Sequence, residues 1–556
     1  MVTIGSRGTR EERRRKSAAD QLLSAHVKSL QALQRPVVLI AGPDSSSTLP
    51  DWRAAFQYRL HVLTTANDAV NFEGINTAVA STNDEMTDYI LSIGPVAAVI
   101  DEEATTLVDR LQRWQRFFFH VTAGGSFMTP IPSVSSTWDA ATQALTSRRI
   151  GASEIDELRD SVRSTYESAG YLITVKDRDH LLKVKDEDAL RILPTRLGAN
   201  NVRVLGSKDA GTTVNKLSAH SHSTASNQKL PADRMLYPAL TLREFRGETT
   251  IKSAMLAVNG ATVLPSSFKH PWRAWNDGLR NINDHVALLR EDDTDCQPLP
   301  GTFYDLSGSI DGDIGHFLTE SVPKLWGWAD AKKRDSELRA LYRTNTVDTE
   351  PAFQRAVLEA FGIAPEDIHF EPRNVTVQRF VSGSQAWQNG GRHYAHPVNR
   401  QVWSRIRAGL VTASDTSPRK VFVTRGAESE TPGPRNRTSV EQLFRDNGFE
   451  IVDVDEMDIA AQARIFGNAT TIAGFAGSGM YRMFLAEHLE KVLVLTHEAN
   501  TGRNEHLFAS LLADEIHYFW SKPDVEHPSG KFSSEAFNSA WDFDLDANRE
   551  ALSRVL

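Results

Sequence analysis

Short apolar runs alternate with helical stretches in the first part of the chain. The runs cover residues 37–40, 60–63 and 97–100, and a further one at 127–128 follows a Gly-Gly turn. Short strands that are separated by helices are typical of a parallel α/β sheet. We therefore expect a Rossmann-like α/β domain over residues 31–205, preceded by a polar segment over residues 1–30.

A more regular rhythm of the same kind occupies the C-terminal half. It predicts strands at 421–424, 451–454, 471–473, 492–495 and 516–519, and helices at 439–445, 459–466, 480–487 and 505–512. Strands and helices in strict alternation indicate a doubly wound α/β domain, to which we assign residues 411–522. The polar tail at 523–556 is expected to be irregular, except for a short helix from about residue 546 onward.

Hydrophobic periodicity is lost between these two parts. Residues 206–233 are rich in Ser, Thr, Ala, Asn and Lys and are predicted to be a linker. His220 and His222 lie there without an acidic or sulfur ligand close in sequence, so we expect no metal site. Residues 234–410 form a further domain, in which Asn259-Gly260 between apolar runs predicts a β-hairpin with a type I′ turn, which needs positive φ at both central residues.

Composition narrows the function classes. A chain of 556 residues exceeds the roughly 300 that one core supports, which predicts two or three domains. A net charge of -9 lacks the basic excess that nucleic acid binding requires. The single cysteine, Cys296, cannot form an intramolecular disulfide, which favours a cytoplasmic location. The basic run within residues 1–16 has no apolar core behind it, and no window suits a spanning helix, so we expect at most peripheral membrane contact.

The N-terminal domain coarsely resembles the later half of a class I methyltransferase fold. Asp101 follows its third apolar run, and Gly124-Gly125 follows a predicted helix. Cofactor binding in such a fold needs a glycine-rich turn after the first strand and an acidic residue after the second. The first strand here runs into a turn with the single glycine Gly42, and the second ends in Thr64-Thr65. We interpret this domain as a degenerate Rossmann-like module that serves as scaffold or binds an acceptor.

The segment from Gly315 to Trp326 is the first candidate for chemistry. On a helix His316 and Glu320 are four residues apart and share a face, beside apolar residues. An imidazole and a carboxylate beside an apolar wall suit general-base catalysis, because burial raises the pKa of a carboxylate toward neutrality. A plain surface pair on a helix remains the alternative.

A glycine-rich turn after the predicted strand at 471–473 is the second candidate. Gly477, Ser478 and Gly479 let backbone amides approach a ligand, and the start of the following helix favours a diphosphate. Arg482 in its first turn can add charge-assisted hydrogen bonds. The alternative is that the small residues serve close packing only.

Arg425 is the third candidate, because residues just past the carboxyl end of a strand face the ligand crevice of such sheets. Asp311-Gly312-Asp313 could be a metal-binding Asp-X-Asp motif. It stands at the end of a polar stretch just before a helix, and we interpret it as a turn and helix cap.

These segments together resemble glycosyltransferase family 61 over about residues 235–520. His316 and Glu320 match the family's His-X-X-X-Asp-or-Glu segment, and Arg425 its strand-end arginine. Further matching residues precede the glycine turn: Glu456, Gln462 and Phe466. The turn departs from the family pattern, since Ala476 and Arg482 stand where a histidine and an asparagine are common.

The resemblance implies a GT-B-like pair of Rossmann-type domains, preceded here by the degenerate α/β domain. It also implies an inverting, metal-independent transfer from a nucleotide-diphosphate sugar to a hydroxyl of a glycan or polysaccharide, of the capsular polysaccharide biosynthesis type, without a further cofactor. In these terms Glu320 is the candidate base and His316 positions it. Arg425, Arg482 and the amides of residues 477–479 stabilise the leaving diphosphate.

Two other functions stay open at this point. One is an S-adenosylmethionine-dependent methyltransferase that acts on glycans, and the other is an inactive glycan-binding protein, which the alanine at position 476 suggests. The sequence leaves the donor sugar, the acceptor and the oligomeric state undetermined.

Overall fold

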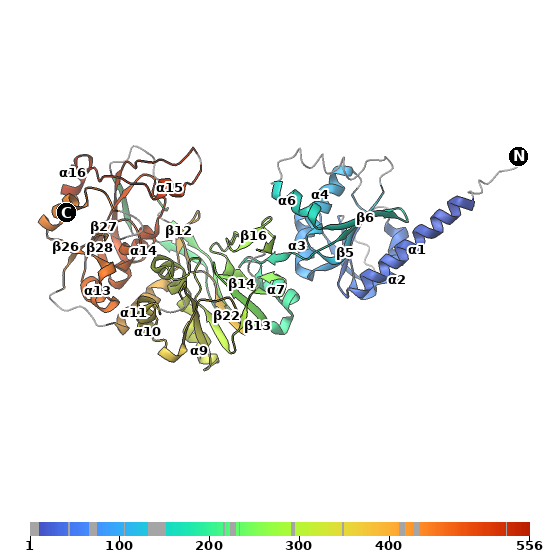
Figure 1. The fold of residues 1–556 in the computed structure, drawn as a ribbon, viewed down its shortest axis with the longest axis horizontal. Helices are drawn as coiled ribbons and strands as arrows, with labels where there is room; N and C mark the ends of the chain where they lie inside the picture. The colour runs from blue at the N-terminus through green and yellow to red at the C-terminus, as the bar shows by residue number, and fades with distance from the viewer. Residues whose placement is uncertain are drawn as a thin grey trace. The chain divides into compact units, whose positions relative to one another are not determined.

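The fold is described from a computed structural model of the chain (Figure 1). It describes residues 10–42, 45–65, 75–104, 106–131, 152–214, 217–222, 230–232, 234–290, 295–346, 350–410, 417–426, 433–529 and 531–556. The chain forms two compact units. Unit 1 comprises Met1–Val202, Val258–Pro265 and Ala274–Thr294, and unit 2 comprises Arg203–Ala257, Ser266–Arg273 and Asp295–Leu556. Among the described helices, none combines the length and apolar character needed to cross a bilayer.

Unit 1 is built on a seven-stranded sheet of order β3-β2-β1-β4-β5-β7-β6. All neighbours are parallel except β7, which runs antiparallel to both β5 and β6. Its strands are β1 (Val37–Ala41), β2 (Leu60–Thr64), β3 (Asn76–Val79), β4 (Val96–Asp101), β5 (Val121–Pro130), β6 (Val162–Ser168) and β7 (Tyr171–Lys176). The predicted α/β sheet is therefore present, and its apolar runs form the buried central strands.

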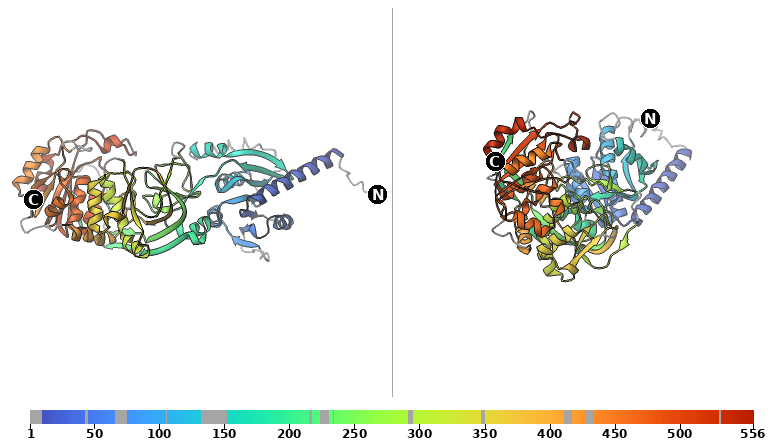
Figure 2. Two further views of the ribbon diagram at one scale, coloured as in Figure 1. Left: turned by 60° about the horizontal axis from the view of Figure 1, so that its bottom comes forward. Right: turned by 60° about the vertical axis from the view of Figure 1, so that its left-hand side comes forward.

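The helices of unit 1 are α1 (Arg10–Ala32), α2 (Ser45–Phe56), α3 (Asn83–Ile93), α4 (Leu107–Phe118), α6 (Ala152–Asp160) and α7 (Ala189–Leu197), with short 3-10 turns η1 (Gln57–Arg59) and η2 (Ala199–Asn201). Most of the predicted polar segment is helix α1, whose C-terminal part lies along the sheet while its start extends beyond it (Figure 2). Leu30 is fully buried, and His26 Nε2 lies 2.9 Å from Ser126 Oγ. The end of α1 thus belongs to the fold of this unit.

A further run of paired strands, of order β16-β17-β8-β15-β14, contains the predicted hairpin. Its strands are β8 (Leu181–Lys183), β14 (Leu256–Asn259), β15 (Thr262–Val263), β16 (Leu279–Asn281) and β17 (Val286–Leu289). Asn259 pairs with Thr262, which confirms the hairpin and leaves Gly260 and Ala261 as its central residues. Only Gly260 has positive φ, at 56°, so the expected type I′ turn is wrong. A glycine at the first central position is what a type II′ turn uses.

Unit 2 contains a mixed sheet of order β13-β22-β19-β20-β21. Its strands are β13 (Leu240–Lys252), β22 (Val375–Gly383), β19 (Thr302–Asp305), β20 (Arg339–Arg343) and β21 (Ile368–Glu371), joined by β9 (Val202–Lys208) and β18 (Gln297–Pro298). The pairs formed by β19, β20 and β21 are parallel, whereas β13 and β22 are antiparallel. Helices α9 (Trp328–Arg334), α10 (Ala352–Phe361) and α11 (Val398–Gly409) and the turns η3 (Pro265–Ser267) and η6 (Pro365–Asp367) accompany it.

The second sheet of unit 2 is fully parallel, with order β11-β29-β28-β27-β25-β26. Its elements are β11 (Ser218–His222), β25 (Lys420–Val423), α12 (Arg437–Asp446), β26 (Glu450–Val452), η7 (Val454–Glu456), α13 (Ile459–Phe466), β27 (Thr471–Phe475), η8 (Ser478–Leu485), β28 (Leu489–His497), α14 (Asn504–Leu512) and β29 (Ala513–Ser521). Each strand predicted in the C-terminal half is present, and the predicted helix at 480–487 is a 3-10 helix that starts at Ser478.

Both faces of this parallel sheet are covered, as a doubly wound domain requires. One face packs with α12 and with α16 (Leu545–Val555) through Phe422, Val440, Phe444, Ala473, Leu493 and Leu552. The other packs with α13, η8 and α14 through Val421, Ile459, Ile472, Met480, Val492 and Leu507. Neighbouring strand residues therefore point to opposite cores, which confirms the predicted doubly wound arrangement.

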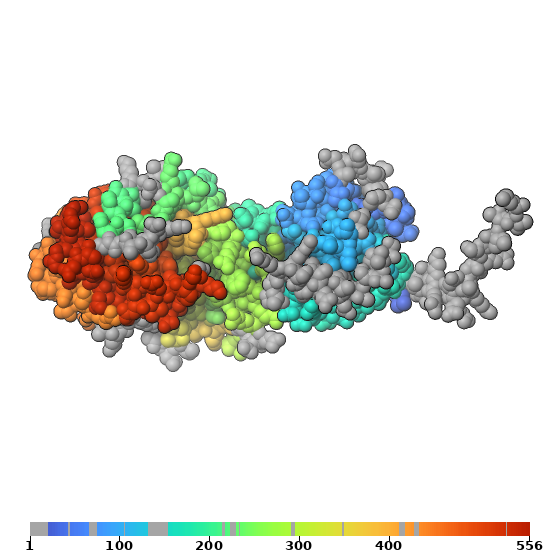
Figure 3. Space-filling view, turned by 90° about the horizontal axis from the view of Figure 1, so that it is seen from above, coloured from blue at the N-terminus to red at the C-terminus, as the bar shows by residue number. Residues whose placement is uncertain are grey.

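Two segments are more ordered than their composition suggested. Within the predicted linker, β10 (Gly211–Val214) pairs with β12 (Arg234–Tyr237), and β11 adds to the edge of the parallel sheet beside β29. In the space-filling view, green residues from this part of the chain lie against the red C-terminal residues (Figure 3). In the predicted tail the expected helix is present as α16, the further short helix α15 (Ser534–Phe537) precedes it, and Trp541 and Phe543 pack on the sheet. Strand β11 is ordered by its pairing with β29 at the edge of the sheet. Its polar residues gave no indication of a strand.

Candidate active site

The loop after β19 leads into the helical segment that carries His316 and Glu320. Gly312 has φ of 79°, and the Asp313 side chain accepts a 2.7 Å hydrogen bond from the His316 N–H. The segment Asp311-Gly312-Asp313 is therefore a turn and helix cap, as expected. Helix α8 (Ile314–His316) continues directly into a π-helical turn, η4 (Phe317–Ser321), and then into the 3-10 helix η5 (Val322–Gly327).

The change of helix type has a local cause. Pro323 has no N–H to donate to the carbonyl four residues before it, so a regular α-helix cannot continue through this position. The N–H of Val322 instead donates to Phe317 O, five residues back, which closes the π turn. Such single turns occur frequently at functional sites.

His316 and Glu320 contact each other directly, as predicted. His316 Nδ1 lies 2.8 Å from Glu320 Oε1. Ser309 donates to the same carboxylate from its N–H at 2.6 Å and from its hydroxyl at 3.0 Å, and Lys269 Nζ lies 3.1 Å away. The His316 side chain is 29% exposed and that of Glu320 is 14% exposed. The carboxylate is thus enclosed by donors, while the imidazole reaches solvent.

These donors decide the charge state of Glu320. Burial by itself would raise its pKa, but the hydrogen bond from His316, the charge of Lys269 and the Ser309 N–H outweigh burial and lower the pKa of Glu320 to about 2. The expectation that burial would raise this pKa toward neutrality is therefore wrong. A carboxylate of so low a pKa is a weak base, and its stronger role is to hold the imidazole.

The glycine turn joins β27 to η8 through close backbone contacts. A Cβ at Gly474 would lie 2.5 Å from Met480 Sδ and 2.6 Å from Val423 O. Gly477 has φ of 140°, and a Cβ there would lie 1.9 Å from Arg425 Nη2. Only glycine fits these two positions without displacing a neighbour.

Two charged side chains already contact this turn. The Arg425 guanidinium donates to Ala476 O, and Glu505 Oε1 accepts a 2.6 Å hydrogen bond from the Gly477 N–H. Glu505 is 3% exposed, and burial raises its pKa. The Gly477 amide, which the sequence suggested for a diphosphate, thus donates to Glu505 instead. Ser478 and Gly479 begin η8, and the N–H groups at the start of a helix lack intrahelical partners.

Arg482 holds the glycine turn in place through side-chain hydrogen bonds. It is 2% exposed, and it donates from Nε to Gln462 Oε1 at 3.1 Å and from Nη1 to Ser478 O at 2.8 Å. Burial lowers the pKa of Arg482 to about 10. The structure favours a supporting position for this residue over the direct donor contact that its sequence position suggested.

The glycine turn and the segment with the histidine and glutamate lie against each other. A Cβ at Gly315 would lie 3.2 Å from Ser478 Cβ and 3.7 Å from Tyr481 Cε2. Since Gly315 directly precedes His316, the structure brings the imidazole segment and the start of η8 to one place.

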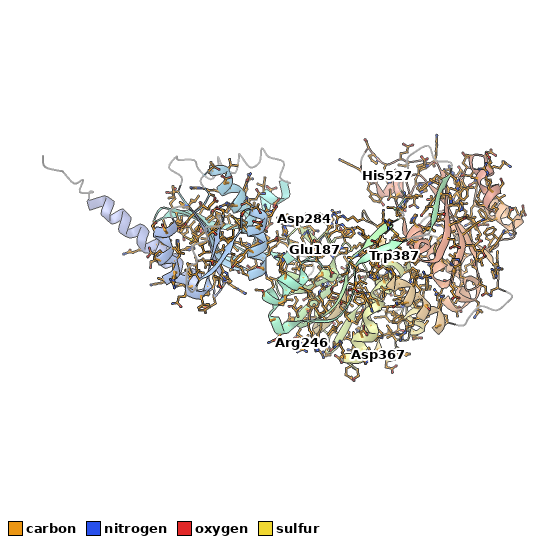
Figure 4. The ribbon with its side chains drawn as sticks, turned by 180° about the vertical axis from the view of Figure 1, so that it is seen from behind. Glu187, Arg246, Asp284, Asp367, Trp387 and His527 are labelled. Atoms are coloured by element: carbon orange, nitrogen blue, oxygen red, sulfur yellow. The ribbon has the colours of Figure 1, made fainter. Side chains whose placement is uncertain are left out.

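Other residues near this place were missed from the sequence. Trp387 of β23 (Trp387–Gln388), labelled in Figure 4, donates to Asn504 Oδ1 at 2.9 Å, and Asn504 donates to the Tyr481 hydroxyl at 2.9 Å. The short hairpin of β23 and β24 (Tyr394–Ala395) is thereby tied to η8. No sequence spacing signals these contacts, because the three residues come from distant segments.

Buried polar atoms beside this hairpin that have no hydrogen-bond partner within the described part of the chain include His270 Nδ1 and Gln388 Nε2. A Cβ at Gly390 would lie 2.5 Å from the His270 ring and 3.2 Å from Gln388 Nε2, so the two side chains lie together. His270 follows Lys269, which contacts Glu320. These side chains can donate to or accept from a ligand beside the carboxylate.

In unit 1 a network of side chains lies beyond the carboxyl ends of β1 and β4. Glu102, directly after β4, accepts hydrogen bonds from Ser45 at 2.6 Å, Thr48 at 2.7 Å and Trp52 at 3.0 Å. A Cβ at Gly42 would lie 2.3 Å from Glu102 O. Ligands of such sheets bind outside the carboxyl ends of the strands, so this network supports the scaffold interpretation. Residues 43 and 44 of the predicted turn lie outside the described residues.

Comparison with known proteins identifies the central part of the chain. Residues 314–493 match the family model described as Glycosyltransferase 61. The predicted resemblance to this family is confirmed over these residues, which contain every site residue predicted from the sequence. Over these residues the chain is similar to glycosyltransferase family 61, which supports a glycosyltransferase.

Similarity to solved structures is weak. The methyltransferase MycE from the mycinamycin biosynthetic pathway, in complex with Mg and SAH, aligns at 17% identity with a TM-score of 0.23, over 28% of this chain and 49% of that chain. A MycE complex that also contains mycinamycin VI aligns at 18% identity with a TM-score of 0.21, over 26% and 46%. This chain thus spans about half the length of either, and such scores do not establish a shared fold. Among curated proteins none matches.

Proposed function

We propose that the protein is an inverting glycosyltransferase that transfers a sugar from a nucleotide-diphosphate donor to a hydroxyl of a glycan or polysaccharide. The contact of Gly315 with Ser478 carries this proposal, because it joins a proton-accepting pair and a phosphate-binding turn in one site. A GT-B-like arrangement, with the donor bound to the parallel sheet, is part of the proposal.

The donor half of the site is the start of η8. The amides of Ser478 and Gly479 and the partial positive charge of the helix start bind the diphosphate. Arg425, which lies against Gly477, stabilises the negative charge that develops on the leaving nucleoside diphosphate. Arg482 holds the carbonyl of Ser478 and so fixes the turn.

The acceptor half is the pair of His316 and Glu320, with their roles exchanged relative to the sequence interpretation. With its proton on Nδ1, His316 donates to Glu320 and leaves Nε2 as an acceptor. The acceptor hydroxyl attacks the anomeric carbon, its proton passes to Nε2, and the bond from this carbon to the diphosphate oxygen breaks. The ionised carboxylate stabilises the imidazolium that forms.

A pH–rate profile distinguishes the two bases. The full chain is screened with nucleotide sugars and saccharide acceptors for nucleoside diphosphate release, and kcat/KM is then measured against pH. An acid limb of this profile reports protonation of the essential base. A carboxylate base with a pKa of about 2 predicts no such limb above pH 4.

Variants test the same assignment. His316→Gln is expected to lower kcat at least a hundredfold, in the range typical of a lost general base. His488→Gln is the matched control, because His488 forms a similar pair with Asp514 but is 57% exposed. Activity of His316→Gln within a few-fold of the unmodified protein would remove His316 as the base.

A further inference from the structure

The loop that joins β23 to β24 carries an exposed arginine in an unusual backbone conformation. Arg392 has φ of 65°, in the left-handed region, which side chains other than those of asparagine and aspartate rarely adopt. Gly390 and Gly391 directly precede it, yet the position with the left-handed φ is the arginine. Residues held in such a conformation cluster at active sites and ligand-binding sites, so this outlier points to a function of the Arg392 side chain.

The guanidinium of Arg392 lies over an aromatic ring. Its Cζ is 5.3 Å from the centre of the Trp272 ring. No hydrogen bond or ion pair of this guanidinium is present among the described residues. An aromatic ring holds a guanidinium through its face, and the N–H groups at the edge match the two oxygens of a carboxylate. The side chain is thus positioned, with its donors available, for a planar anion.

A short series of contacts leads from this arginine to the candidate active site. The ring centres of Trp272 and His270 lie 6.0 Å apart, and Lys269 Nζ lies 3.1 Å from Glu320 Oε1. A Cβ at Gly390 would lie 2.5 Å from His270 Cε1. The loop with the arginine therefore lies against the segment that contacts the carboxylate of the active site.

The charges in this place favour an anionic ligand. Burial lowers the pKa of His270, and the charges of Arg273 and Lys269 lower it further, against the opposing charge of Glu320. Glu320 pairs with Lys269. The charge of Arg392 has no carboxylate partner within the described part of the chain, so it is available to a ligand.

We propose that Arg392, held over Trp272, binds the carboxylate of an acidic sugar unit in the acceptor, which makes a glycan that contains uronic acid the substrate class. The diphosphate of the donor is the other anion of the proposed reaction, but that anion has its own place at the start of η8 beside Arg425. The word acceptor rests on the proposed function, whereas the binding of an acidic saccharide does not.

Titration calorimetry of the full chain tests the proposal. The probes are a tetramer of galacturonic acid, a tetramer of mannuronic acid and a hyaluronan tetrasaccharide. Each is compared with its own methyl ester, which is the same saccharide without the negative charges. We expect saturable binding of at least one acidic tetramer, with an affinity about tenfold or more above that of its ester.

Variants of the arginine locate this binding. Arg392→Gly removes the guanidinium and suits a φ of 65°, so the fold is retained. It should lower the affinity for the acidic tetramer about tenfold or more and leave that for the ester unchanged. Arg392→Lys keeps the charge without the planar fork and should lose affinity several-fold. Arg549→Ala is the matched control, because it removes the same charge from a side chain that is 77% exposed on α16, and it should change nothing.

Uridine diphosphate is the probe for the donor side. Its affinity should be the same in the unmodified protein and in Arg392→Gly. A tenfold loss there would assign the arginine to the donor and overturn the proposal. So would equal affinities for acidic tetramer and ester, equal affinities of the unmodified protein and Arg392→Gly for the acidic tetramer, or the absence of binding by all three acidic tetramers.

The two proposals fail separately. Binding of an acidic tetramer that depends on Arg392, without measurable transfer from any nucleotide sugar, would leave the saccharide site standing and sink the enzyme. Transfer that depends on His316, without any preference for acidic saccharides, would leave the enzyme standing and sink the role of Arg392.

Discussion

The charge state of Glu320 predicts how stability depends on pH. Its pKa falls from the ordinary value of 4.5 to about 2 in the folded protein. A carboxyl group whose pKa is lower in the folded state stabilises that state above the unfolded pKa, and the stabilisation is lost as the pH falls through the folded pKa. Glu320→Gln removes this titration, so the variant should lose stability at neutral pH and much less in acid.

The size of the effect follows from the two pKa values. At about 1.4 kcal/mol per pKa unit, the shift corresponds to about 3 kcal/mol at pH 7. The same two values leave about 2 kcal/mol at pH 3.5 and about 1 kcal/mol at pH 3. The difference in unfolding free energy between the unmodified protein and Glu320→Gln should therefore shrink by about half or more over this range.

Urea unfolding followed by tryptophan fluorescence and circular dichroism measures this difference at pH 7, 5, 4, 3.5 and 3. Glu550→Gln is the control, because Glu550 is 81% exposed and should leave the curve unchanged. A difference that stays constant from pH 7 to pH 3 would refute the reasoning, since it would show that Glu320 has a similar pKa in the folded and unfolded chain.

Further variants distinguish residues that stabilise the fold or tune a pKa from residues that contact the ligand. Gly477→Ala should destabilise the fold by about 1–3 kcal/mol in urea unfolding, because its Cβ would meet the Arg425 side chain at a φ that alanine disfavours; unchanged stability would contradict this. Arg425→Ala should weaken nucleoside diphosphate binding tenfold or more in calorimetry. Arg482→Met should lower the free energy of unfolding by about 2 kcal/mol and leave the affinity for nucleoside diphosphate unchanged. The reverse pattern would exchange the roles of the two arginines. Lys269→Met should raise the pKa of Glu320, seen as a carboxyl titration by NMR at higher pH than in the unmodified protein; no movement would remove this lysine as a cause.

The C-terminal sheet was predictable because local pattern and global fold agree there. Its apolar strands are buried on both faces, and α12 and α13 bury residues at helical spacing, so the period changes visibly at their boundaries. The spacing of His316 and Glu320 was sufficient to predict their contact, since residues four apart meet in helical turns. The turn and cap at residues 311–313 followed from local chemistry in the same way.

The electrostatics of the site could not be predicted, because they depend on contacts between distant segments. Lys269 and Ser309 reach Glu320 from outside its helix and reverse the expected direction of its pKa shift. Glu505 reaches Gly477 across 28 positions in sequence and holds an amide that had been assigned to the donor. Nothing in the spacing of these residues signals that the chain brings them together.

Strand β11 has a practical consequence for anyone who prepares the sugar-transferring part alone. A fragment cut at residue 234, where the composition suggests a boundary, would leave the long strand β29 with an open edge. The cut would also remove Ser221, whose hydroxyl oxygen accepts a 2.8 Å hydrogen bond from the indole N–H of Trp520. Unpaired apolar edges invite self-association, so such a fragment would precipitate where one that begins before residue 218 stays dispersed.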